Sequence, residues 1–402
     1  MNAKLIFLLI VLLLACATQV SSDVYLPSLL TIAHTLEGGS LRLAQLSITL
    51  FLFAVSLSQL IMGPISEGIG RKWPLVIGLV IMAIGSVICA TATHINGLLL
   101  GRFIQGIGAG ALAALWRAIF RDVMTGEDLA KYSSVVSVFM IFVVSAAPAL
   151  GGYFEKAGWR SAFVFMLLYC VVALLVMVFQ YKETNAGVHL DKLKPVAIYQ
   201  HYKSLISHPV FIVMTLCVCL SYGGLFSWIV VSPTLLMKHI GLSATQFGWL
   251  MAVICAVGYS AGAVVNARYV KKFGMPLMMR IGWSLMIVGG LLQWGGYYVS
   301  GISLSAIVLP VFVFYFGSTL IWPNAFATAF TPFGHIAGYA GSLYGFMQLV
   351  GGAIIGSLAA HLPASDQRPL ALIIITTALL AFILYQCLVL PAIFRESNDA
   401  GA

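Results

Sequence analysis

Asp23 is the one acidic residue that the sequence places well inside a long apolar segment, four residues before Pro27 in the run ATQVSSDVYLPSLL. A carboxylate inside a membrane is costly unless it is paired, protonated or facing water, so such a residue marks a working site by default. Since Pro27 has no N–H, the Asp23 carbonyl lacks its usual helix partner, and the helix has a polar break at the acid. This position suits reversible proton binding.

Arg102 is the basic residue that can meet Asp23. From Lys4 to Asp23, and from Arg121 back to Arg102, there are 19 residues, so each buried group lies about 28 Å from its own end of the membrane. At this shared level, a nearby guanidinium favours the charged acid, and separation or desolvation favours the protonated acid. We expect this pair to couple transport to protons. The alternatives are a headgroup position for Asp23 and a permanent structural pair.

The composition is that of an all-α membrane protein with many spans. Hydrophobic residues make up 61% of the 402 residues and charged residues 8%, against roughly 25% charged in soluble domains. About 20 helical residues cross a ~30 Å hydrocarbon layer, so this length can hold about twelve spans. We place twelve transmembrane helices near residues 5–30, 44–65, 73–93, 97–118, 132–154, 160–181, 209–237, 245–266, 276–299, 303–327, 337–360 and 370–394.

Basic residues gather in alternate loops between these spans. With the N-terminus in the cytoplasm, inner loops hold fourteen of the 21 lysines and arginines and outer loops hold five, while Arg102 and Arg117 lie inside the fourth span. This asymmetry fits positive-inside placement with both termini cytoplasmic. It also accounts for the formal net charge of +9, so no nucleic-acid partner is expected.

The N-terminus allows a competing interpretation. Residues 1–16 resemble a lipoprotein signal that is cleaved before Cys16. Cleavage would leave eleven spans, so we expect the first helix to remain and to run through Asp23 to the loop before Glu37. All seven cysteines fall within predicted spans, which argues against a disulfide framework. Cys217 and Cys219 lack zinc-like partners, so no metal site is expected.

The sequence looks like two related halves. The runs VSSDVYLPSLL from Val20 and FSWIVVSPTLL from Phe226 share a serine, a proline and two leucines at matching positions. We predict six-helix bundles over 1–181 and 209–402, joined by a hydrophilic cytoplasmic linker over 182–208. Parallel repeats place a substrate site between the halves near mid-membrane and permit alternating access by rocking.

Three motifs resemble those of a known family. The run GPISEGIGRK from Gly63 matches the loop pattern G-x-x-x-D-x-x-G-R-K, with Glu67 in place of the usual Asp. The run from Arg102 matches R-x-x-x-G-x-G, and the run APALGG from Ala147 matches G-P-x-x-G-G, with Ala147 in place of its first glycine. These motifs resemble the major facilitator superfamily.

Shorter runs indicate a branch of that superfamily. DVYLP from Asp23 is close to D-M-Y-L-P, and the runs RAIFRD from Arg117 and GYAGSLYGFMQ from Gly338 accompany it. They resemble the Bcr/CflA branch of drug/proton antiporters. The resemblance covers nearly the whole chain and implies two pseudo-symmetric six-helix bundles.

Two of the motifs predict moving parts. The loop motif can form a conformational latch in which Glu67 contacts a helix N-terminus or a basic helix end such as Arg121; a simple charged turn is the alternative. The antiporter motif can bend and seal the fifth span, or be a purely structural kink. The latch comprises Gly63, Glu67, Gly70, Arg71, Lys72 and Arg121, and the hinge comprises Pro148, Gly151 and Gly152.

Aromatic residues on four spans that line the cavity in the superfamily are substrate candidates. Aromatic walls with few polar groups suit amphipathic organic molecules, although lipid contact or helix packing fits each residue as well. Arg117 either reaches the cytoplasmic interface or faces the cavity. The predicted cavity residues are Tyr25, Arg117, Tyr222, Phe226, Trp228, Tyr315, Trp322, Tyr344 and Gln348.

We therefore predict a proton-coupled exporter of small amphipathic organic molecules in a bacterial inner membrane, acting as a monomer without a cofactor other than protons. No P-loop, H-E-x-x-H or G-x-S-x-G motif is present, so no catalytic site is expected and the protein is not predicted to be an enzyme. The alternatives are an exporter dedicated to one endogenous metabolite, such as a siderophore, and a non-transporting receptor or scaffold.

Overall fold

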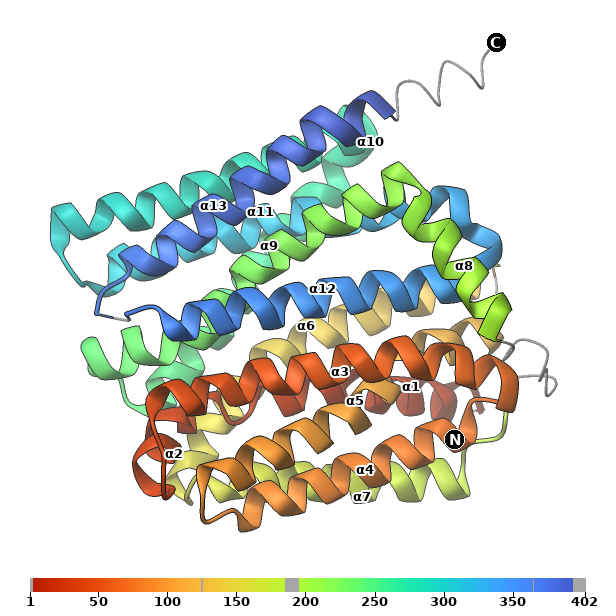
Figure 1. Cartoon of the computed structure of the whole chain (residues 1–402), viewed down its shortest axis with the longest axis horizontal. Coiled ribbons are helices and arrows are strands. Elements are labelled where there is room, and N and C mark those ends of the chain that lie inside the picture. The colour runs from red at the N-terminus through yellow and green to blue at the C-terminus, as the bar shows by residue number, and fades with distance from the viewer. Residues whose placement is uncertain (1–2, 124–125, 185–194, 364, 393–402) are drawn as a thin grey trace. The chain divides into compact units, whose positions relative to one another are not determined.

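The computed structural model describes residues 3–123, 126–184, 195–363 and 365–392, and some side chains within these ranges, including that of Arg121, lie outside the description. Helices dominate the described chain (Figure 1). They are α1 (Ala3–Asp23), η1 (Leu26–Ser28), α2 (Leu29–Thr35), α3 (Leu41–Ile69), α4 (Lys72–Thr91), α5 (Ile95–Val123), α6 (Gly126–Lys156), α7 (Arg160–Phe179), α8 (Pro195–Ser207), α9 (Pro209–Pro233), η3 (Thr234–His239), α10 (Ala244–Ser300), α11 (Leu304–Phe330), η4 (Thr331–Ile336), α12 (Ala337–His361), α13 (Arg368–Leu384) and η5 (Tyr385–Val389).

The helices account for the predicted number of spans. Within the described residues, ten helical segments are long and apolar enough to cross a membrane. One of them, α10, has 57 residues and turns at Gly274, where φ is 79° and ψ is 154°, so it supplies two spans. Together with the 31 residues of α6, the total is twelve.

Two compact units divide the chain. The first comprises residues 1–199, 242–252 and 341–346, and the second comprises 200–241, 253–340 and 347–402. The predicted boundaries at 181 and 208 between two bundles and a linker stay a prediction.

The first unit is built around α5, which lies beside α3 and α4 (Figure 1). Small residues permit this close approach, because a Cβ at Gly106 would lie 2.5 Å from the Phe51 carbonyl oxygen of α3. A Cβ at Gly85 of α4 would lie 2.7 Å from the Cα of Gln105. Helix α1 packs against α5, α6 and α7. The packing of α1 against α5 therefore sets the level along these helices at which Asp23 and Arg102 lie.

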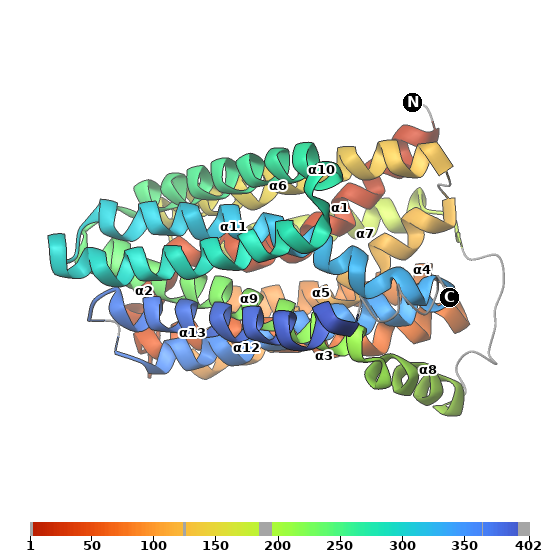
Figure 2. The same ribbon diagram turned by 90° about the horizontal axis from the view of Figure 1, so that it is seen from above.

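The second unit is organised by the fold-back of α10. A Cβ at Gly262 would lie 2.7 Å from the Phe316 carbonyl oxygen, and one at Gly282 would lie 2.7 Å from that of Gly317. Both arms of α10 therefore pack against the same stretch of α11, which lies beside them in Figure 2. Trp283 joins the arm after the turn to α9 through a 3.1 Å hydrogen bond from Nε1 to Ser221 Oγ.

The two predicted repeats end their first helices differently. The expected single helix over 5–30 stops at Asp23, turns through η1 and resumes as α2. In the second repeat, α9 runs on to Pro233 and continues directly as a π-helix. The linker also holds a helix, α8, that its hydrophilic composition did not predict.

Candidate functional site

Asp23 lies at the C-terminal end of α1, where the helix is interrupted. The N–H of Val24 still donates to the Val20 carbonyl at 3.1 Å, but a 3₁₀ turn containing Pro27 follows. The Asp23 side chain is buried, with 6% of the residue exposed. An acid at this depth lies where the backbone itself has lost helix hydrogen bonds, as the sequence predicted.

Arg102 is fully buried on α5, facing the same end of α1. Its guanidinium carbon lies 4.4 Å from the ring centroid of Tyr25 and 4.0 Å from that of Phe51. The Tyr25 hydroxyl is in turn 2.9 Å from Ser47 Oγ on α3. Two aromatic faces thus hold the cation in place through cation–π contacts.

One nitrogen of Arg102 makes both of its hydrogen bonds. Nη1 donates to the Ser21 carbonyl oxygen at 2.9 Å and to Oε1 of Gln105. Gln105 is itself held by its Nε2, which donates to Ser86 Oγ on α4 at 2.8 Å. Because Ser21 is in the last turn of α1, Arg102 caps a carbonyl at the end of this helix and places positive charge at its negative end.

The other donors of Arg102 are unused. Nε and Nη2 are buried and have no hydrogen-bond partner among the described residues. No ion pair within 4.0 Å joins Arg102 to Asp23 in this part of the structure, although Ser21 is only two residues before the acid. An arginine carries five N–H donors, so Arg102 can donate hydrogen bonds to a carboxylate and still keep its bond to the Ser21 carbonyl. Arg102 can therefore bind a charged Asp23 more strongly than a neutral one.

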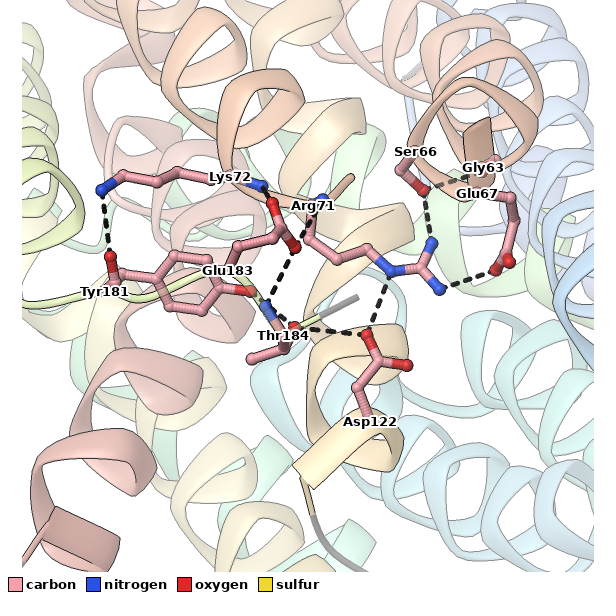
Figure 3. A network of polar contacts seen from close by, with 9 residues as sticks. All are labelled: Gly63, Ser66, Glu67, Arg71, Lys72, Asp122, Tyr181, Glu183 and Thr184. Atoms are coloured by element: carbon pink, nitrogen blue, oxygen red, sulfur yellow. Dashed lines mark hydrogen bonds and ion pairs between the residues drawn. The ribbon is translucent and has the colours of Figure 1, made fainter. Parts of the chain in front are cut away.

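A second polar network surrounds Arg71, between α3 and α4 (Figure 3). Nε donates to Asp122 Oδ2 at 3.1 Å, Nη1 to Ser66 Oγ at 2.6 Å and Nη2 to Glu67 Oε1 at 2.7 Å. Arg71 therefore binds residues of its own motif, and it also binds Asp122 near the end of α5. The predicted contact of Glu67 with Arg121 stays a prediction, because that side chain lies outside the described residues.

Glu183, just after α7, completes this network and was not predicted. Its two carboxylate oxygens accept the backbone N–H groups of Arg71 and Lys72 at 3.0 Å each, at the start of α4. A carboxylate is favourable there because the first N–H groups of a helix are unpaired and carry partial positive charge. Gly70, with φ 93°, leaves room for it, since a Cβ would lie 2.7 Å from Glu183 Oε2.

Charge and burial shift the pKa values of two groups in this network. Burial alone would lower the pKa of Arg71, but the hydrogen bond to Glu67 and the charges of Glu67 and Asp122 raise it above the usual arginine value. Burial raises the pKa of Tyr181 to about 12. Both groups therefore keep their protons at neutral pH, and the latch holds a permanent cation.

The glycines of the predicted hinge meet two neighbours. A Cβ at Gly151 would collide with the Val24 carbonyl oxygen and lie 3.1 Å from Pro27 Cδ, so α6 packs directly on the break after Asp23. A Cβ at Gly152 would lie 2.6 Å from the Ala244 carbonyl oxygen at the start of α10. Pro148 lies inside α6. Whether the motif acts as a hinge stays a prediction.

The predicted cavity residues fall into several environments. In the first unit, Tyr25 is fully buried against Arg102, Tyr344 is buried, and Arg117 is exposed with its guanidinium carbon 4.4 Å from the Trp116 ring centroid. In the second unit, Trp228 is fully buried and Gln348 is half-buried.

Four of these residues form an aromatic cluster around Tyr259, which was not predicted. Tyr259 has ring centroid distances of 4.9 Å to Tyr315 and 6.0 Å to Trp322, and Tyr222 lies 5.4 Å from Trp322 and 5.0 Å from Phe226. The buried Nε1 of Trp322 has no acceptor among the described residues. A substrate role for this cluster stays a prediction. In the same described residues, no group of three His, Cys, Asp or Glu side chains could hold a metal ion.

Known proteins match the chain over nearly all its length. Residues 9–356 match the family model described as Major Facilitator Superfamily. Multidrug resistance protein D of Escherichia coli (strain K12) is 25% identical over 396 residues, which cover 98% of this chain and 97% of that protein. The bicyclomycin resistance protein homolog of Haemophilus influenzae is 26% identical and covers 92% of each. The xylose transporter XylE from E. coli, in a partially occluded inward open conformation, has a TM-score of 0.71 at 16% identity, covering 95% of this chain and 97% of its own.

Proposed function

Since this chain belongs to the major facilitator superfamily, we propose that it is a secondary transporter that exports small amphipathic organic molecules in exchange for protons. The predicted all-α major facilitator fold and the predicted resemblance to the Bcr/CflA branch are both confirmed by the matches above. The two relatives named for multidrug and bicyclomycin resistance support export of organic compounds as the direction and substrate class.

The proposal rests on two buried residues, Asp23 at the end of α1 and Arg102 of α5 beside it. Asp23 lies at a break in the helix, and the fully buried Arg102 beside that helix end has unused donors on Nε and Nη2. A charged Asp23 can take these donors, and a protonated Asp23 leaves them free. Proton binding thus changes which contacts stabilise this end of α1, against which Gly151 of α6 packs.

The cycle follows from this change. Substrate enters from the cytoplasmic side while Asp23 is charged; after outward opening, a proton binds Asp23, substrate leaves, and the protonated carrier returns. We place the protein in a bacterial inner membrane with both termini cytoplasmic, supported by the basic residues of the alternate loops. No cofactor other than protons and no partner subunit is required.

A proton-flux screen in proteoliposomes tests this function. Purified protein is reconstituted with a pH-sensitive dye inside, and cationic, neutral and anionic amphipathic compounds are added in turn. We expect some of these compounds to induce proton movement that protein-free vesicles lack. Proton flux with one endogenous metabolite alone would indicate a dedicated exporter, and no flux with any compound would reject the proposal.

A further inference from the structure

A second carboxyl lies on the contact between α6 and the interrupted first span. Glu155 is four residues after Gly151, and Thr31 is four residues after Pro27. The Thr31 hydroxyl donates a 2.5 Å hydrogen bond to Oε1 of Glu155. Because Gly151 and Glu155 are four residues apart on one face of α6, the Glu155–Thr31 contact lies one turn of α6 beyond the Gly151–Pro27 contact. We call the surface formed by these four residues the α2–α6 seam.

The second oxygen of Glu155 has no donor. Oε2 is buried, and none of the described residues offers it a hydrogen bond. A charged oxygen in this position loses its hydration without a replacement, which is unfavourable. Binding of a proton at Oε2 removes the charge. The closed seam leaves this oxygen without a donor among the described residues, and water that entered an open seam could supply one.

Neighbouring charges do not supply the missing partner. On α2, His34 is exposed; on α6, Lys156 Nζ lies 5.2 Å from the Tyr153 ring centroid. Arg160, which begins α7, donates to the Ala92 carbonyl oxygen at 2.8 Å. The adjoining start of α10, residues 244–252, contains no charged residue. Among the described residues, Cys16 of α1 donates to Met140 Sδ on α6, and Asp23 lies at the far end of the same contact.

We propose that Glu155 is a second proton-binding site, which holds the α2–α6 seam closed when protonated and admits water when charged. The proton comes from water at this end of α6, binds Oε2, and returns to water or passes on to Asp23. Ser28 lies in η1 between Pro27 and Thr31 of the seam, and its buried hydroxyl also lacks a partner among the described residues. An open seam therefore offers a hydrated route along the break. The transport role of this site rests on the proposed proton coupling.

Thiol labelling in proteoliposomes tests the seam directly. Ser28→Cys serves as the reporter in a Cys387→Ser background, since Cys387 is the exposed native cysteine among the described residues. Labelling by a membrane-impermeant maleimide is measured over a pH series with and without Glu155→Gln. The comparison is made at each pH, so the ionisation of the reporter thiol itself cancels. Glu155→Gln keeps an acceptor for Thr31 and cannot become charged.

With Glu155 present, we expect labelling to rise with pH more steeply than the thiol alone explains, and Glu155→Gln should lose this excess. Glu37→Gln, an exposed acid in the same unit, should keep it and is the matched control. Equal labelling with and without Glu155→Gln, in proteins with equal melting temperatures, would overturn the proposal. If Glu155→Gln melts lower, Thr31→Val replaces it: removing the donor to Oε1 should increase labelling, and unchanged labelling would overturn the proposal.

The proposed transport function and the role of Glu155 can be rejected independently of each other. Asp23→Asn should abolish export driven by a pH gradient while the Glu155-dependent labelling persists. If the parent protein shows no such export, proton coupling is rejected, and the labelling still decides whether Glu155 controls the seam.

Discussion

Arg102 donates a 2.9 Å hydrogen bond to the carbonyl oxygen of Ser21, two residues before Asp23. The guanidinium therefore stabilises the end of α1 whatever the charge of the acid, and its Nε and Nη2 have no partner among the described residues. Because Arg102 holds the Ser21 carbonyl and can also bind Asp23, it links the protonation of Asp23 to the conformation of the helix end. The proposed coupling of transport to protons depends on this double role of Arg102.

Gln105→Leu should destabilise the protein, because Arg102 loses one of the two acceptors of Nη1 and keeps only the Ser21 carbonyl oxygen among the described residues. A hydrogen bond to a charged group contributes about 1.5–3 kcal/mol, so thermal unfolding in detergent should occur at a clearly lower temperature. Thr49→Val is the control, because that buried hydroxyl bonds, among the described residues, only to the local Leu46 carbonyl at 3.0 Å. Parental stability of Gln105→Leu would contradict the described role of this bond.

Gly151→Ala should impair transport by separating α6 from the break after Asp23. The added methyl collides with the Val24 carbonyl oxygen, and such overpacking costs about 1–3 kcal/mol. Gly97→Ala is the matched control, since its nearest neighbour is the Ala92 Cβ at 3.7 Å. Substrate exchange in proteoliposomes measures the effect. Normal exchange by Gly151→Ala would show that this close contact is not required.

Arg71→Lys should weaken the latch although it preserves the charge. A lysine cannot reach Asp122, Ser66 and Glu67 at once, because these contacts use three separate nitrogens of the guanidinium fork. We expect a loss of about 1–3 kcal/mol in stability. Arg42→Lys, an exposed arginine at the start of α3, is the control, and equal melting temperatures for the two variants would refute the assignment.

Asp366→Asn should lower thermal stability in a pH-dependent way. Side-chain hydrogen bonds from Arg368, at 3.0 and 2.9 Å, lower the pKa of Asp366 below its usual value. The stabilisation is therefore present above the unfolded pKa of about 3.9 and disappears as pH falls through the lower folded pKa. Melting curves of the two proteins should differ at neutral pH and converge in acid. A constant difference at all pH values would contradict this.

Sequence periodicity and motif spacing predicted the helical spans and the buried environment of Asp23, because hydropathy and the missing N–H of Pro27 act locally. The same reasoning missed Gln105 and Glu183. Both are ordinary polar residues whose importance arises from helices distant in sequence: Gln105 joins Arg102 to α4, and Glu183 caps α4 from beyond α7. The position of Glu183 directly after the sixth predicted span was the available signal.

Glu155 was missed for a different reason. The fifth span was predicted to end at residue 154, which placed this acid in an outer loop, whereas α6 continues to Lys156. These two additional helical residues bring the carboxyl of Glu155 against Thr31. The residue at which a helix ends depends on tertiary contacts, and a hydropathy profile carries no information about these contacts.

Accumulation of substrate by Asp23→Asn in proteoliposomes under an imposed pH gradient tests the central claim most directly. Substrate exchange without a gradient serves as the control that the variant is folded and binds. We predict that Asp23→Asn exchanges substrate but neither accumulates it nor moves protons with it. Accumulation driven by the pH gradient at the parental rate would contradict the assignment of Asp23 as the coupling site.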